Sequence, residues 1–109
     1  MDAEQLLRRL GLSGRLKGFG YAAYMIERAT ETPSAVQLIT KNLYPETARH
    51  FQTSISAVER DLRTLVRSCW YHGDRAFLET VAGTNIPEKP VNSEFLDMTA
   101  AYLRRKEKS

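Results

Sequence analysis

Residues 44–71 read YPETARHFQTSISAVERDLRTLVRSCWY, and this stretch contains the clearest helical pattern in the chain. In its second half, apolar residues recur at spacings of three and four, which is typical of an amphipathic α-helix. These residues are Val58, Leu62, Leu65, Val66, Cys69 and Trp70. The run Ser56-Ala57-Val58-Glu59 fits a capping box, because serine at the cap and glutamate three residues later can each bond a backbone amide. We therefore predict a helix between about Ser56 and Tyr71, which Gly73 ends.

The rest of the chain repeats this spacing and has no convincing stretch of strict alternation, so the predicted fold class is all-α. We expect a compact bundle of about six or seven helices that forms a single domain over residues 1–109. Asp2 is predicted to cap the first helix, Gly83 to end the sixth, and Asn92 or Ser93 to begin the last. A further helix is expected through Ala35, Leu38, Ile39 and Leu43.

A short helix is predicted directly before the long one. Pro45 suits its first turn, since proline lacks only an amide that has no partner there. The small Ala48 allows the two helices to approach, and Phe51, Ile55 and Val58 are expected to fix the angle between them. The spacing of these residues is that of a helix-turn-helix.

The outer side of the predicted long helix carries a row of arginines. Arg60, Arg63 and Arg67 follow Ser56 at spacings of four, three and four, so their side chains share one solvent face. A guanidinium group pairs with guanine O6 and N7 or with two phosphate oxygens, and the major groove of DNA admits one helix. We therefore predict sequence-specific binding of double-stranded DNA, with Arg60 and Arg63 on base edges and Arg67 on phosphate.

Hydroxyl groups gather where the predicted long helix begins. Thr53, Ser54 and Ser56 lie at this N-terminal end, where hydroxyls and free backbone amides suit phosphate oxygens. We predict that these three side chains contact DNA phosphates.

Two other interpretations of the basic face stay open. Glu59 lies four residues before Arg63, so the two side chains can form a surface ion pair, and a row of arginines is often only a solvated face. The alternative function is a helical adaptor that binds an acidic protein partner through this face or through the segment between Gly73 and Thr84.

Composition and motifs exclude several classes of protein. The formal charge is +3, and there is neither an apolar run of about 20 residues for a membrane span nor a secretory signal, so we expect a soluble, cytoplasmic protein that binds no membrane. Cys69 is the only cysteine, and with His72 and His50 it does not complete a zinc site of four ligands. No nucleophile has a recognisable base, so we expect no catalytic residue, metal or cofactor, and no enzyme.

Several runs of residues also carry a resemblance that extends over essentially the whole chain. The most specific are Val58-Glu59-Arg60 and Asn92-Ser93-Glu94-Phe95, and they occur with Leu43-Tyr44-Pro45, Ala48, Phe51, Thr53, Arg63, Trp70 and Lys89-Pro90. Together they resemble the C-terminal effector domain of the sporulation initiation response regulator of endospore-forming bacteria, the stage zero sporulation protein A family.

The resemblance implies a six-helix domain with a helix-turn-helix that binds a TGTCGAA-like box. Such boxes often occur in tandem, so the domains would lie head to tail as a dimer on DNA. It assigns Glu59, Arg60 and Arg63 to the base edges, which suits a carboxylate that accepts from cytosine and arginines that donate to guanine. By position, it also implies that the segment between Gly73 and Thr84 contacts the sigma subunit of RNA polymerase.

The sequence departs from the family pattern in two respects. Ala57 stands where an arginine is usual and Thr64 where a histidine is common, so affinity or sequence preference is expected to differ. The receiver domain that precedes this module in the family is missing, which leaves open whether the chain is a fragment or a stand-alone relative.

Overall fold

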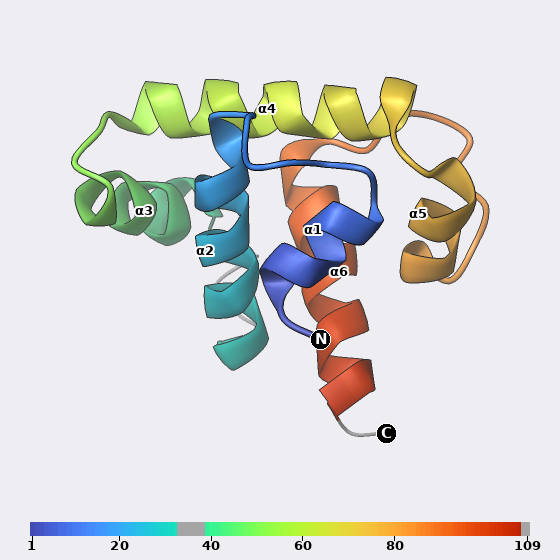
Figure 1. The fold of residues 1–109 in the computed structure, drawn as a ribbon. Helices are drawn as coiled ribbons and strands as arrows, with labels where there is room; N and C mark the ends of the chain where they lie inside the picture. Colours follow the sequence, from blue (N-terminus) through green and yellow to red (C-terminus); the bar gives the residue numbers. More distant parts are fainter. Residues whose placement is uncertain (33–38, 108–109) are drawn as a thin grey trace.

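The computed structural model describes residues 1–32 and 39–107, and these residues form six α-helices and one π-helical turn (Figure 1). In chain order they are α1 (Ala3–Arg9), α2 (Gly18–Glu31), the π-helical turn η2 (Ile39–Leu43), α3 (Tyr44–His50), α4 (Ile55–His72), α5 (Arg75–Ala82) and α6 (Asn92–Glu107). The described ranges contain no strand. The predicted all-α bundle of six or seven helices is thus confirmed.

The longest helix, α4, lies across one end of the molecule, and the other helices pack below it (Figure 1). Helix α2 packs on α4 and α6, while α3 packs on α4. Leucine is the commonest residue in the core between them, and Phe95 of α6 is the largest fully buried side chain. Within the described ranges, no helix is both long and apolar enough to cross a lipid bilayer.

The predicted ends of the helices are largely confirmed. Asp2 and Gln5 form a capping box at α1, in which each side chain accepts a hydrogen bond from the other residue's amide, at 2.8 and 2.9 Å. Gly83 ends α5 with a φ of 77°, the left-handed conformation that glycine adopts without a steric cost. Pro45 lies in the first turn of α3.

The start of α4 differs from the prediction. Ser54 caps the helix, since its side chain accepts a hydrogen bond of 3.0 Å from the amide of Ala57. The predicted box of Ser56 and Glu59 is therefore wrong. Ser54 has the extended backbone of a cap residue (φ −93°, ψ 157°), whereas Ser56 already lies inside the helix. The helix consequently begins at Ile55 and ends at His72, one residue beyond the predicted end.

Two expectations about the region before α4 also change. The helix expected through Ala35, Leu38, Ile39 and Leu43 falls partly on residues 33–38, which lie outside the described residues, and its described part, Ile39–Leu43, is π-helical. The expectation that Phe51 and Ile55 lock α3 against α4 is wrong, because they are 37% and 45% exposed. Phe51 instead packs edge-on against Tyr21 of α2, with ring centroids 5.0 Å apart.

Candidate nucleic-acid interface

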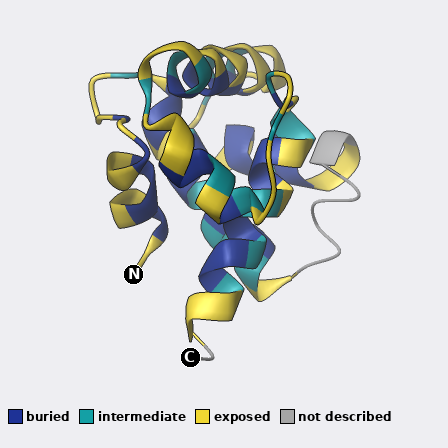
Figure 2. Ribbon diagram, turned by 90° about the vertical axis from the view of Figure 1, so that its right-hand side faces the viewer, coloured by how far each residue is buried: buried dark blue, intermediate teal, exposed yellow. Residues whose placement is uncertain are grey.

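Helix α4 has one buried and one exposed side. Its buried residues are Val58, Leu62, Leu65, Val66 and Cys69, which confirms the predicted apolar sector except for Trp70, which is only half-buried. In Figure 2, the side of this helix that faces away from the rest of the molecule is exposed, while its underside is buried. Burial of the apolar side therefore fixes which residues α4 presents to solvent.

The three arginines of the predicted row are all exposed. The Arg60 Nε donates to Asp61 Oδ1 at 3.2 Å, and the Arg63 Nη1 donates to Glu59 Oε1 at 3.2 Å. The Arg67 side chain forms no hydrogen bond or ion pair with the part of the chain that the structure describes. Both side chains of the Arg63–Glu59 pair are about half exposed, so that pair contributes only about 0.3 to 0.5 kcal/mol and a stronger anionic partner can replace it.

The predicted hydroxyl cluster lies at the N-terminal end of α4. Ser54 and Ser56 are exposed, and Thr53 is half-buried in the turn between α3 and α4. The Ser54 oxygen accepts the capping bond, and this leaves its hydroxyl proton free to donate, because a serine hydroxyl can do both. The turn itself comprises residues 51–54, between the end of α3 and the start of α4.

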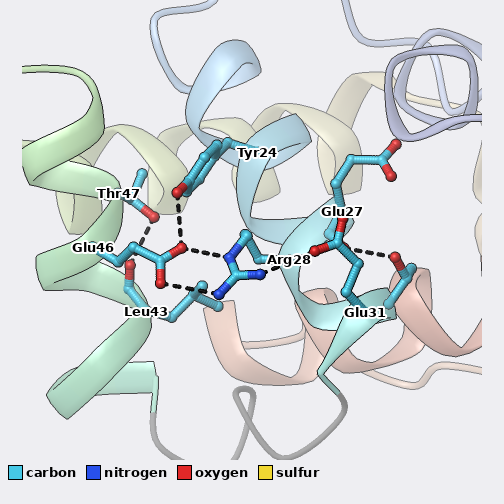
Figure 3. A network of polar contacts seen from close by, with 8 residues as sticks. Tyr24, Glu27, Arg28, Glu31, Leu43, Glu46 and Thr47 are labelled. Atoms are coloured by element: carbon cyan, nitrogen blue, oxygen red, sulfur yellow. Dashed lines mark hydrogen bonds and ion pairs between the residues drawn. The ribbon is translucent and has the colours of Figure 1, made fainter.

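A polar network holds α3 against α2 (Figure 3). The Arg28 guanidinium donates to both oxygens of Glu46, through Nε at 2.6 Å and Nη2 at 3.2 Å, and the Tyr24 hydroxyl donates to the same carboxylate at 2.8 Å. These bonds from Arg28 and Tyr24 lower the pKa of Glu46, and the partnership raises the pKa of Arg28. The first helix of the motif is thereby anchored to α2.

Asn92 joins three helices beside the arginine row. Its side-chain amide donates to the Tyr44 hydroxyl of α3 at 2.9 Å and to the backbone oxygen of Glu59 in α4 at 3.3 Å. Sequence reasoning missed this role and treated Asn92 only as a helix start. The only sequence feature that marked Asn92 was its place in the Asn92-Ser93-Glu94-Phe95 run. Nothing in that run indicates that its side chain bonds to α4.

Cys69 and His72, the residues considered for a zinc site, are not arranged to bind a metal. Cys69 is buried in the core, and desolvation there raises its pKa to about 11. His72, the last residue of α4, is exposed. Across the described ranges, no three His, Cys, Asp or Glu side chains lie close enough together to hold a metal ion.

A short helix, a four-residue turn and a longer helix with an exposed basic side define the class of helix-turn-helix DNA-binding domains. Comparison with protein families agrees with this class. Residues 3–103 match the family described as sporulation initiation factor Spo0A C terminal, and the chain belongs to this family. It is therefore a DNA-binding effector domain of the sporulation response regulator kind.

Proposed function

We propose that this domain binds a TGTCGAA-like box in double-stranded DNA by placing α4 in the major groove. The base-reading residues of the proposal are Glu59, Arg60 and Arg63. The observation that carries it is the exposure of this side of α4 while the opposite side is buried. Arginine donates to guanine O6 and N7, and a carboxylate accepts from cytosine N4, so the residue types suit a box that contains both bases.

The ion pair between Glu59 and Arg63 supports the proposal that these two side chains contact neighbouring bases together. Held 3.2 Å apart on an exposed helix face, the carboxylate and the guanidinium can address neighbouring bases with little loss of side-chain freedom. Arg60 lies on the same face, and its contact with Asp61 leaves the side chain 60% exposed. These three side chains are thus available to a partner without unfolding any part of the core.

The proposed phosphate contacts flank the reading residues along α4. Thr53, Ser54 and Ser56 lie at its N-terminal end, where the free hydroxyl proton of Ser54 supports donation to a phosphate oxygen. Arg67 lies one helical turn beyond Arg63. Since Arg67 is exposed and unpaired within the described residues, it can meet a backbone phosphate without losing an internal bond.

Further protein contacts form part of the proposal. The segment between Gly73 and Thr84, which includes α5, would contact the sigma subunit of RNA polymerase. Its support is the exposure of Ala76 and Thr80, while Phe77 and Val81 face the core. On tandem boxes, two copies of the domain would lie head to tail.

Selection of bound duplexes from a random pool tests the proposal. We expect an enriched box similar to TGTCGAA, with altered preference at the positions that face Ala57 and Thr64. Affinity for the selected duplex should fall with salt, with a slope of log affinity against log salt of about 0.9 per phosphate contacted. If no box is enriched and affinity does not respond to salt, the basic face instead serves an adaptor that binds an acidic protein.

A further inference from the structure

An open pocket of about 350 Å³ lies beside the base-reading residues of α4. Its lining comes from three parts of the chain that are distant in sequence: α3, α4, and the segment formed by the end of the loop before α6 and the first residues of α6. The lining residues are Tyr44, Glu59, Arg63, Lys89, Val91, Asn92 and Ser93. The pocket therefore brings Lys89 of the Lys-Pro run and Asn92 and Ser93 of the Asn-Ser-Glu-Phe run together with two of the proposed base-reading side chains.

The pocket carries an excess of positive charge. Arg63 and Lys89 contribute two cations, and Glu59 contributes one carboxylate, which already pairs with Arg63 at 3.2 Å. Lys89 forms no hydrogen bond or ion pair with any described residue, although its side chain is half-buried. A lysine that is partly removed from water and lacks a partner favours an anion that enters the pocket.

The backbone around Lys89 is held in place from both sides of the pocket. Pro90, the next residue, is buried, and the Asn92 side chain bonds both the Tyr44 hydroxyl and the Glu59 backbone oxygen. On its other side Lys89 lies near Glu88 and Glu94; the Glu94 carboxylate accepts a hydrogen bond of 2.9 Å from the Val91 amide, and neither carboxylate forms an ion pair with Lys89 among the described residues. Lys89 and Ser93 are thus kept at a fixed position beside α4.

We infer that Lys89 and Ser93 bind a phosphate of the DNA backbone, and that Asn92 positions them against α4. This inference rests on the proposed entry of α4 into the major groove. Arg63 belongs both to this pocket and to the reading face, so an anion in the pocket lies at the edge of the groove that α4 occupies. The anion at that edge is a phosphodiester, and lysine and serine are residues that contact it.

The test compares two lysine substitutions that remove the same charge. Lys89→Gln acts at the pocket, whereas Lys106→Gln acts near the far end of α6, which runs away from α4 (Figure 1). Affinity is measured for the selected duplex and for a scrambled duplex between about 50 and about 200 mM salt. We expect Lys89→Gln to weaken both duplexes by a similar factor, about fivefold, and to reduce the salt slope by about 0.9. Lys106→Gln should change neither quantity by a comparable amount.

A second variant separates positioning from general stability. Asn92→Ala removes two hydrogen bonds that hold Lys89 beside α4, so we expect the salt slope to fall here too. In the Asn92→Ala background, Lys89→Gln should have a smaller additional effect than in the wild type. A purely structural role for Asn92 would lower the melting temperature but leave the effect of Lys89→Gln on the slope intact.

The possible outcomes distinguish this site from the proposed function. If the wild type shows a steep salt slope and Lys89→Gln behaves like Lys106→Gln, the phosphate site is overturned while groove binding by α4 stands. If the wild-type affinity shows neither a preferred box nor a salt dependence, both proposals fail. A loss confined to the selected duplex would also overturn the phosphate assignment, because a backbone contact does not discriminate between sequences.

Discussion

Gly18 lies directly against the backbone carbonyl of Asp61, so close that a Cβ atom on Gly18 would overlap the carbonyl oxygen. The first residue of α2 is thus in backbone contact with the middle of α4. Neither backbone can yield without moving a whole helix. The observed position of α4 against α2 therefore requires a glycine at residue 18.

We expect Gly18→Ala to lower the free energy of unfolding by about 1 to 3 kcal/mol, the usual cost of forcing an extra methyl group into a packed contact. Gly20→Ala is the matched control in the same helix. A Cβ there would meet only the Phe51 ring at 3.7 Å, so alanine should be neutral or stabilising by up to about 1 kcal/mol. Urea denaturation followed by circular dichroism measures both effects. Equal stability of the two variants would contradict the close approach.

The parts of the fold that could be predicted from the sequence depend on neighbouring residues, whereas contacts between separate helices could not be predicted. The caps at Asp2 and Gly83 and the apolar side of α4 depend on residues within one or two helical turns, so their patterns are visible in the sequence. The contact of Gly18 with Asp61 joins separate helices, and no local spacing announces it. A glycine at the start of a helix looks the same with or without such a neighbour.

The features of the candidate site likewise divide into those that a local sequence pattern predicts and those that it does not. The arginine row follows from periodicity alone, and it is exposed as expected. The cap of α4 was misplaced because Ser54 and Ser56 both suit an N-cap, and only the backbone conformation distinguishes them. The bond between Asn92 and Glu59 spans 33 residues of sequence, which places it beyond any local pattern.

Arg60→Ala should reduce sequence discrimination. We expect a loss of about 1 to 3 kcal/mol on the selected duplex and little change on a scrambled one, because Arg60 is proposed to bond a base edge. The fold should be retained, since the Arg60 side chain is 60% exposed and, among the described residues, bonds only its neighbour Asp61. Fluorescence anisotropy with the two duplexes measures the difference.

Arg67→Ala serves as the control for this prediction. It removes the same charge from the same helix face, but at a proposed phosphate contact. Its loss should therefore be similar on both duplexes. Similar losses on both duplexes for Arg60→Ala would instead reassign Arg60 to the DNA backbone.

The Cys69 thiol should be protected in the folded protein. Burial raises its pKa to about 11, so at about pH 8 only a small fraction is the reactive thiolate, and the side chain is also shielded from reagents. We expect labelling by an aromatic disulfide reagent to be at least about a hundredfold slower in the native state than in urea. Since the chain has one cysteine, the signal belongs to this residue alone. Rapid labelling of native protein would place the thiol at the surface.

Stability should depend on acid pH through Glu46. Its bonds to Arg28 and Tyr24 lower the pKa of its carboxyl below the ordinary value of 4.5, so its contribution is present above that pH and is lost as the pH falls through the lowered value. We expect Glu46→Gln to cost about 0.5 to 1 kcal/mol at neutral pH, because the two charged side chains are about one-third exposed. The difference between wild type and variant should vanish at a pH well below 4.5.

Glu31→Gln provides the control for Glu46, because Glu31 pairs with the same arginine at 3.0 Å but its side chain is 63% exposed. Its substitution should change the free energy of unfolding at neutral pH by less than that of Glu46, since solvent screens the exposed pair more strongly. Urea denaturation at a series of pH values separates the two carboxylates. A constant difference between wild type and Glu46→Gln from neutral to strongly acid pH would show that hydrogen bonding, and not charge, holds α3 to α2.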